Sequence, residues 1–169
     1  FERNKDDVRL ALVQMRAKEI GAPVAYVNMT GGQDDLVFDG DTIVVSKEGS
    51  VLARTGQFDD QLIVVDIDCA EGTSRPDVVI SEEPTSHSIP ADSTIATRLS
   101  NEAEMWQALV MGLRDYVGKN GFRSVVLGLS GGIDSALVAA IAIDALGAKR
   151  VNGVAMPSKY SSGHSVEDA

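Results

Sequence analysis

The stretch SVVLGLSGGIDSALVAAIAIDALG, residues 124–147, decides the fold of the second half of the chain. Residues 124–129 are almost all apolar, which is typical of a strand buried on both faces of a parallel sheet. A Ser-Gly-Gly turn follows, then helix-forming residues at 134–146, a stop at Gly147 and a second apolar run at 151–155. A strand, a helix and a strand within about thirty residues predict a βαβ unit with a right-handed crossover.

The first third of the chain predicts one helix and a small sheet. Apolar residues at helical spacing favour a helix over residues 6–20, and Gly21 ends it. Pairs of residues with turn chemistry separate the β-branched runs that follow. The predicted strands are residues 24–27, 36–38, 42–45, 51–53 and 62–66, and the predicted turns are Gly31-Gly32, Asp39-Gly40 and Glu48-Gly49. We therefore expect a meandering sheet behind one helix.

An acidic stretch separates the two halves of the chain. Between Asp66 and Glu104 there are nine acidic and two basic residues, a local charge of −7, together with three prolines. Such a composition is typical of a solvated linker between domains. A helix is expected directly after it, where Asn101 and Glu104 resemble a capping pair and Asn120-Gly121 marks the end. Its apolar stripe consists of Trp106, Leu109, Val110, Leu113 and Val117.

The composition excludes several classes of function. The 169 residues, 44 % hydrophobic and 24 % charged, are typical of a globular protein with one full domain or two partial ones. The net charge of −10 argues against nucleic acid and anionic membranes as partners. The longest apolar run, residues 136–143, is far too short to cross a bilayer. The single Cys69 cannot form an internal disulfide, which favours a reducing compartment, the cytoplasm.

Both ends of the sequence look like cuts through a longer protein. No signal peptide is visible at Phe1, and residues 165–169 resemble a helix start whose single turn would be marginal in water. We therefore expect further sequence on both sides, and expect the 169 residues alone to be inactive.

The residues that indicate chemistry lie at 128–135, between the carboxyl end of a strand and the amino end of a helix, where open α/β sheets bind ligands. The glycine pair lets the backbone approach a ligand, and the first N–H groups of the helix favour an anion. Ser130 and Ser135 add hydroxyl donors suited to phosphate oxygens. Asp134 would repel a bare phosphate, so a Mg²⁺ ion that bridges the carboxylate and the phosphates is expected.

Several other motifs compete for this segment. Ile133 stands where a Walker A loop needs lysine, and no Gly-x-Gly-x-x-Gly pattern is present. Residues 128–132 satisfy Gly-x-Ser-x-Gly, which would make Ser130 the nucleophile of a serine hydrolase. Asp144 and His164 could complete a triad in chain order, but Asp144 falls near the far end of the same helix, on the order of 15 Å away along its axis. A noncatalytic nucleotide-binding module and a turn without a ligand also stay open.

The loop resembles a known family. Ser130-Gly131-Gly132-Ile133-Asp134-Ser135 matches the SGGxDS loop of the N-type ATP pyrophosphatases, or PP-loop enzymes. With the following Ala-Leu-Val-Ala and the later MPSKYSS at 156–162, it is similar to NAD synthetases. Residues 1–40, with Lys5 and the run GGQDDLVFDG, resemble the later part of a nitrilase-like glutaminase domain, as fused in glutamine-dependent NAD synthetases.

The resemblance implies a fold and an activity. The expected fold is α/β, with part of a nitrilase-like α+β sandwich at residues 1–68, an acidic linker at 69–99 and the first βαβ unit of a PP-loop sheet at 100–169. The implied reaction is the ATP-dependent amidation of deamido-NAD to NAD. Ammonia comes from glutamine, and adenylation of the nicotinate carboxylate releases pyrophosphate before ammonia displaces AMP. Another PP-loop amidotransferase or tRNA-modifying enzyme is the alternative within the same chemistry.

The resemblance also implies roles for particular residues. The ATP-binding residues would be Gly128, Leu129, Ser130, Gly131, Gly132, Ile133, Asp134, Ser135 and Met156, with Met156 near the adenine and Asp134 holding Mg²⁺. Lys5 stands where the family contacts glutamine. The catalytic Glu, Lys and Cys of the glutaminase would all precede Phe1, and Cys69 is interpreted as a structural cysteine.

Asp34, Asp35 and Asp39 are interpreted as turn residues rather than parts of a glutaminase site. The implied partners are the small molecules deamido-NAD, glutamine and ATP, with no nucleic acid and no membrane. A homo-oligomer is expected for the full-length protein.

Overall fold

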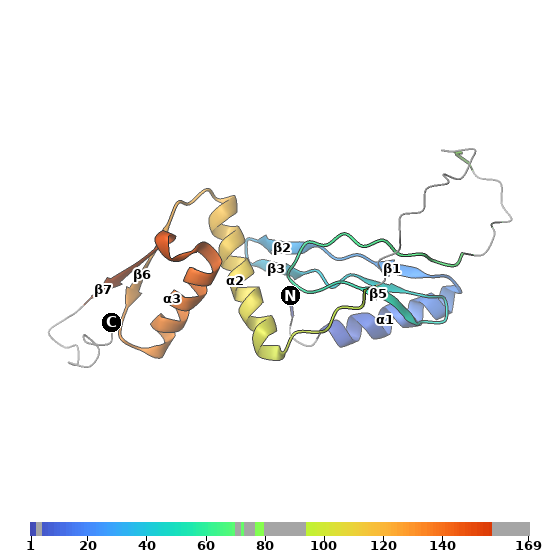
Figure 1. The fold of residues 1–169 in the computed structure, drawn as a ribbon, viewed down its shortest axis with the longest axis horizontal. Helices are drawn as coiled ribbons and strands as arrows, with labels where there is room; N and C mark the ends of the chain where they lie inside the picture. Colours follow the sequence, from blue (N-terminus) through green and yellow to red (C-terminus); the bar gives the residue numbers. More distant parts are fainter. Residues whose placement is uncertain (3–4, 70–71, 73–76, 80–93, 157–169) are drawn as a thin grey trace. The chain divides into compact units, whose positions relative to one another are not determined.

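The computed structural model describes residues 1–2, 5–69, 72, 77–79 and 94–156 (Figure 1). The chain divides into two compact units, each of which is described by itself. One consists of Phe1, Met29–Asp39 and the part from Leu99 on, and the other of Glu2–Asn28 and Gly40–Arg98. These units follow contacts rather than chain order, so the domain boundaries expected from the sequence stay predictions.

The unit that starts at Glu2 contains one helix on a small antiparallel sheet. Helix α1 (Lys5–Ile20) packs on strands β1 (Val24–Tyr26), β4 (Ile43–Val45) and β5 (Val51–Arg54), which lie in the order β1-β4-β5 (Figure 1). The buried core consists of Val13, Ala17, Ile43 and Val45. The spacing of Val13 and Ala17 by four residues places both on the face of α1 that meets the sheet. The expected sheet behind a helix is confirmed here.

A buried ion cluster closes the same unit. Asp41 is fully buried, and its backbone adopts a φ of +60° in the turn before β4. Arg54 of β5 donates to both carboxylate oxygens over 2.6 and 2.8 Å, and Arg98 approaches one of them at 2.8 Å. Arg9 of α1 lies 3.9 Å away. A single carboxylate thus links the helix, the sheet edge and the segment that returns beside β5.

The other unit begins with a two-stranded hairpin that differs from the expected pattern. Strands β2 (Thr30–Gln33) and β3 (Leu36–Asp39) pair antiparallel, and Asp34-Asp35 forms the turn between them. The interpretation of Asp34 and Asp35 as turn residues is therefore confirmed, whereas Asp39 is buried at the end of β3. The prediction of a turn at Gly31-Gly32 is wrong, because both glycines lie inside β2 opposite Phe38 and Val37.

One predicted strand is absent from the structure. Residues 62–66 have no regular secondary structure, and the side chain of Leu62 is 92 % exposed. A β-branched composition favours a strand only where a partner strand pairs with it, and no described strand pairs with this segment.

The βαβ unit follows a long helix, as expected. Helix α2 (Asn101–Lys119) ends at Asn120, after which Gly121 takes a φ of +72°. Its N-cap is Ser100, whose hydroxyl accepts from the amide of Ala103, so the expected Asn101–Glu104 capping pair is wrong by one residue. Trp106, the first residue of the predicted apolar stripe, is half-buried and does not belong to the buried core. No helix within the described ranges has both the length and the apolar character that a membrane crossing requires.

The parallel strand pair is the last feature of this unit. Strands β6 (Val125–Leu129) and β7 (Val151–Ala155) pair in parallel over all five residues, and α3 (Ile133–Leu146) and the short 3-10 helix η1 (Ala148–Arg150) connect them. Gly147 ends α3 as predicted. Burial of β6 on both faces is not observed, since Val126 is 71 % exposed. Within the described part of the chain β7 is the only strand beside β6, and α3 covers one face (Figure 1).

We predict that Asp41→Asn destabilises the sheet that contains β4 and β5. Asparagine keeps the shape and the left-handed backbone, so the substitution removes mainly the charge that faces the arginines. Breaking a buried ion pair on one side costs about 3 kcal/mol. Hydrogen exchange of the β4 and β5 amides should reveal this loss, and Asp60→Asn at an exposed position should leave the exchange unchanged. Equal protection in both variants would contradict a stabilising role for Asp41.

Candidate functional site

The candidate site is the SGG loop (Ser130, Gly131, Gly132), which joins the carboxyl end of β6 to the amino end of α3. Gly131 takes a φ of +74°, a backbone conformation that favours glycine. Gly132 is the N-cap of α3 and lies in the extended region, with φ −97° and ψ 155°. Because the cap residue has no side chain, it supplies no oxygen to the first N–H groups of the helix. These N–H groups and the helix dipole therefore point toward a place where an anion is favoured.

Two serine hydroxyls hold the loop in its bent form. The hydroxyl of Ser135 donates to the carbonyl of Gly132 over 2.9 Å and lies 3.2 Å from the hydroxyl of Ser130. The amide of Ser130 donates to Ser135 Oγ over 3.3 Å, and the amide of Gly132 donates to Ser130 Oγ over 3.4 Å. The loop is thus organised by its own residues, and the two hydroxyls meet inside its bend.

The acidic residue of the motif lies at the start of the helix. Asp134 is exposed and is the acidic residue in the first turn of α3. No group of three or more His, Cys, Asp or Glu side chains gathers around a possible metal position in the described ranges. One carboxylate fits a magnesium ion only where phosphate oxygens and water complete its octahedral shell. The donor set is therefore suited to a metal that arrives with a nucleotide.

The structure brings Met156 and Gly128 together. A Cβ atom added to Gly128 would lie 2.3 Å from the terminal methyl carbon of Met156, so the methionine side chain lies directly over the glycine. Met156 follows the carboxyl end of β7, beside the end of β6, and it is 69 % exposed. Both residues therefore flank the SGG loop at the same edge of the sheet. This position agrees with the expected contact to an adenine, which stays a prediction.

The serine hydrolase alternative finds no support in the described residues. The hydroxyl of Ser130 contacts the Ser135 hydroxyl and the Gly132 amide, neither of which is a general base. Asp144 accepts a hydrogen bond of 2.9 Å from the indole N–H of Trp106, so its carboxylate stabilises the packing of α2 on α3. His164, the third member of the weighed triad, lies outside the described residues.

The remaining predicted residues lie away from the SGG loop in the sequence. Lys5 is the first residue of α1, in the other unit, and its contact with glutamine stays a prediction. Cys69 is a free, exposed thiol.

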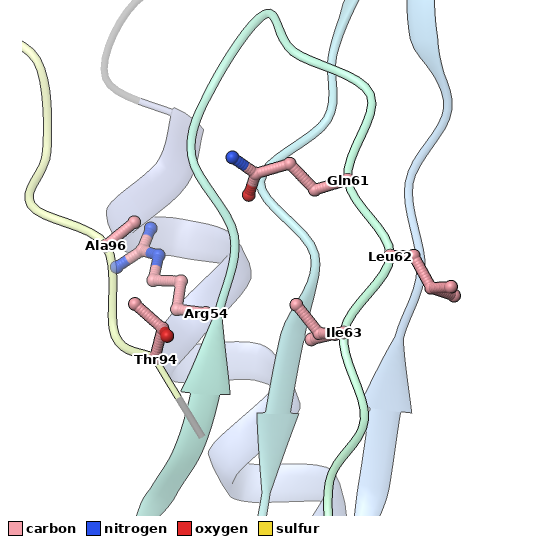
Figure 2. A pocket seen from close by; sticks show the side chains of 6 residues that line it. All are labelled: Arg54, Gln61, Leu62, Ile63, Thr94 and Ala96. Carbon is pink, nitrogen blue, oxygen red and sulfur yellow. The ribbon is translucent and has the colours of Figure 1, made fainter. Parts of the chain in front are cut away.

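A concavity near β5 has a structural explanation. It has a volume of about 300 Å³ and is lined by Arg54, Gln61, Leu62, Ile63, Thr94 and Ala96 (Figure 2). Its one charged lining residue is Arg54, whose guanidinium is held by the buried Asp41. The Arg54 guanidinium therefore balances the internal charge of Asp41 and does not indicate a binding site for a ligand.

Sequence reasoning missed one set of contacts completely. Asp115 and Lys119 of α2 hold the backbone of Gly32 in β2, more than eighty positions earlier in the chain. The only local signals were the glycine pair inside a β-branched region and Gly112 in the interior of a helix, where glycine costs about 1 kcal/mol relative to alanine.

Each half of the chain matches the protein family that its sequence resembles. Residues 2–77 match the carbon-nitrogen hydrolase family, and residues 105–169 match the NAD synthase family. Similarity to curated proteins extends across the junction between the two matches.

Three curated relatives illustrate this similarity, and each is a glutamine-dependent NAD(+) synthetase. The protein of Xanthomonas campestris pv. campestris is 46 % identical over 96 % of this chain and 27 % of its own length. The Synechocystis sp. protein is 42 % identical over 100 % of this chain and 28 % of its own length. The Thermotoga maritima protein is 42 % identical over 100 % of this chain and 32 % of its own length. This chain thus spans about 30 % of the length of these relatives.

Solved structures give the same result. The glutamine-dependent NAD+ synthetase of Acinetobacter baumannii, in complex with ADP, is 38 % identical with a TM-score of 0.75, over 99 % of this chain and 29 % of its own. The glutamine-dependent NAD(+) synthetase of Cytophaga hutchinsonii is 20 % identical, with a TM-score of 0.64 over 96 % of this chain and 30 % of its own. At this identity the likeness supports the fold alone. The resemblance inferred from the sequence is therefore confirmed: this chain matches, from end to end, a segment of the glutamine-dependent NAD(+) synthetase family.

Proposed function

We propose that this chain is part of an enzyme that converts deamido-NAD to NAD with ATP and with ammonia released from glutamine. The observation that carries the proposal is the SGG loop at the open amino end of α3, in a chain whose relatives carry the name of this activity. In the reaction, the nicotinate carboxylate attacks the α-phosphorus of ATP and pyrophosphate leaves. Ammonia then attacks the acyl carbon of the adenylate, loses a proton, and AMP leaves with the former carboxylate oxygen.

The part that this chain plays is electrostatic. Pyrophosphate gains negative charge as it departs, and preorganised N–H groups stabilise such charge without rearranging. The amides of Gly131 and of Ile133 to Ser135 are suited to that role. The amides of Ser130 and Gly132 and the hydroxyl of Ser135 donate within the loop, and they would contact the phosphates by exchanging these bonds. Mg²⁺ held with the help of Asp134 would neutralise part of the phosphate charge. No residue of this chain acts as a nucleophile, and the chain by itself is inactive.

The adenine and the glutamine are assigned to opposite parts of the chain. Gly128, Leu129 and Met156 would place the adenine at the carboxyl edge of β6 and β7, where Met156 lies over Gly128. The Acinetobacter baumannii relative was solved in complex with ADP, which supports an adenine nucleotide as the ligand. Lys5 would contact glutamine. The catalytic Glu, Lys and Cys of the glutaminase would precede Phe1. Residues 1–68 are assigned to the glutaminase domain, 69–99 to the acidic linker and 100–169 to the ATP pyrophosphatase domain.

The setting follows from charge and composition. The net charge of −10 fits small-molecule substrates rather than nucleic acid or an anionic membrane. A single free thiol fits a reducing cytoplasm. A homo-oligomeric complete enzyme completes the proposal.

The direct test is pyrophosphate release from ATP by the complete protein. We expect release that depends on deamido-NAD and that equals the amount of AMP formed. Release of phosphate in place of pyrophosphate, or hydrolysis of simple esters by Ser130, would disprove the proposal.

We predict that Asp134→Ala abolishes NAD formation while glutamine hydrolysis persists. The exposed carboxylate in the first turn of α3 is assigned to the metal and not to the stability of the loop, whose hydrogen bonds come from the two serines. Both rates are measured in the same preparation, so the glutaminase rate is the control for folding. A synthetase rate equal to that of the unmodified protein would remove Asp134 from the metal site.

We predict that two neighbouring glycine substitutions differ in their effect on nucleotide binding. Gly131→Ala forces alanine to a φ of +74°, and a penalty of about 1.4 kcal/mol weakens binding of a nonhydrolysable MgATP analogue about tenfold. Gly132→Ala is the matched control, because its backbone is extended and an added Cβ meets only Ser130 Oγ at 3.4 Å. Calorimetric titration measures both. Equal weakening in the two variants would show that the bend at Gly131 is not what the nucleotide requires.

A further inference from the structure

Two side chains of α2 hold both backbone polar groups of one hairpin residue. Asp115 Oδ2 accepts from the amide of Gly32 over 2.7 Å, and Lys119 Nζ donates to the carbonyl of the same glycine. Gly32 stands opposite Val37 in β3, and its polar groups face the outer edge of β2. A strand edge normally pairs with another strand. Here the spacing of Asp115 and Lys119 by four residues lets one helix face supply both an acceptor and a donor.

The helix and the hairpin approach each other too closely for larger residues. A Cβ atom added to Gly32 would lie 3.2 Å from Asp115 Cβ and 3.2 Å from the Cα of Gly112. A Cβ added to Gly112 would lie 3.2 Å from Val37 Cγ2. Glycine in the middle of a helix is destabilising by about 1 kcal/mol relative to alanine, so Gly112 needs a reason in the packing. The reason is the hairpin that lies against it.

The contact is charge-assisted. Burial of Asp115 raises its pKa, but the hydrogen bond from the Gly32 amide, with Arg114 and Lys119 nearby, outweighs burial and lowers the pKa below its usual value. Arg114 Nε donates to Asp115 Oδ1 over 3.1 Å, and Lys119 lies 3.9 Å from Oδ2. Asp115 is therefore ionised at neutral pH, and hydrogen bonds to ionised groups are about twice as strong as neutral ones.

This contact joins segments that match two different families. The hairpin lies within residues 2–77, which match the carbon-nitrogen hydrolase family, and most of α2 lies within residues 105–169, which match the NAD synthase family. The carboxyl end of α2 is followed by Gly121, then by β6 and the SGG loop. We call this contact of Gly32, Gly112, Asp115 and Lys119 the hairpin joint.

We propose that Asp115 and Lys119 are positioning residues that allow ammonia released from glutamine to be used for NAD formation. This inference rests on the proposed function, which needs two reactions in one protein. The SGG loop hydrogen-bonds only among its own residues, so the hairpin joint acts through the placement of the hairpin on α2. Loss of the joint therefore leaves the synthetase reaction with free ammonium intact and impairs the reaction with glutamine.

The test compares two nitrogen sources in the complete protein. Lys119→Met removes the donor to Gly32, and Asp115→Asn removes the charge while it keeps the shape. We expect NAD formation from ammonium chloride to stay near that of the unmodified protein. NAD formation from glutamine should fall at least about fivefold, the lower end of the usual coupling between sites. The number of glutamines hydrolysed per NAD formed should rise accordingly.

Three comparisons keep the outcome clear. Lys149→Met also removes one positive charge, at an exposed lysine outside the joint. It should change neither the ammonium-dependent nor the glutamine-dependent rate of NAD formation. Lys119→Arg keeps a donor and should restore most of the glutamine-dependent rate. Gly32→Ala should reproduce the defect by a steric route, because the nearest obstacles include helix backbone.

Two outcomes would overturn the positioning role. A parallel fall of the ammonium- and glutamine-dependent rates would show that the joint serves stability alone, and unchanged rates would show that it does not matter. An unmodified protein that forms no NAD from deamido-NAD and ATP, with ammonium or with glutamine, would instead overturn the proposed function, and this inference with it.

Discussion

The parallel pairing of β6 with β7 determines where this chain presents its candidate site. Parallel strands cannot be joined by a tight turn, so the chain must cross over through a helix. The crossover starts at the carboxyl end of β6, which places the amino end of α3 there too. The N–H groups of that helix end, the dipole and the SGG loop then converge at one edge. The glycine at 131 is needed because the chain turns from strand to helix within three residues.

The hairpin joint holds together two segments that match different families. The close approach depends on Gly32 and Gly112, which have no side chains to keep the backbones apart. The side chains of Asp115 and Lys119 then satisfy the amide and the carbonyl of Gly32, which would otherwise face water or be buried without partners. The contact is polar and specific in register, which suits a role in positioning more than a role in stability.

The cluster around Asp41 solves a different problem in the other unit. The buried carboxylate of Asp41 accepts two hydrogen bonds from the guanidinium of Arg54 and forms an ion pair with Arg98. Segments that are distant in the sequence therefore meet at one point. A buried charge requires such compensation, since an unpaired ion in the interior is strongly unfavourable. The same requirement keeps Arg54 away from ligand chemistry, although its side chain lines a concavity (Figure 2).

Much of the local structure was determined by the sequence itself. Apolar periodicity and stop residues predicted α1, α2, α3 and the parallel pair β6 and β7, because these depend on neighbours a few positions apart. The bend of the SGG loop was also local, since its serines and glycines lie within six residues. The strand expected at 62–66 failed, because strand formation needs a partner that the segment itself does not contain.

Only the tertiary structure decided what the glycines at 31 and 32 do. Taken as a pair in sequence, they have the chemistry of a turn, yet they lie in β2, where they pair with Phe38 and Val37 of β3 and approach α2 closely. The hydrogen bond from Gly32 to Asp115 spans 83 positions, and no local pattern records a contact of that range. No local pattern marks Asp41 either, yet arginines from three segments meet around it. A sequence states which groups are available, whereas the energy of burying a backbone group or a charge depends on what the fold places beside it.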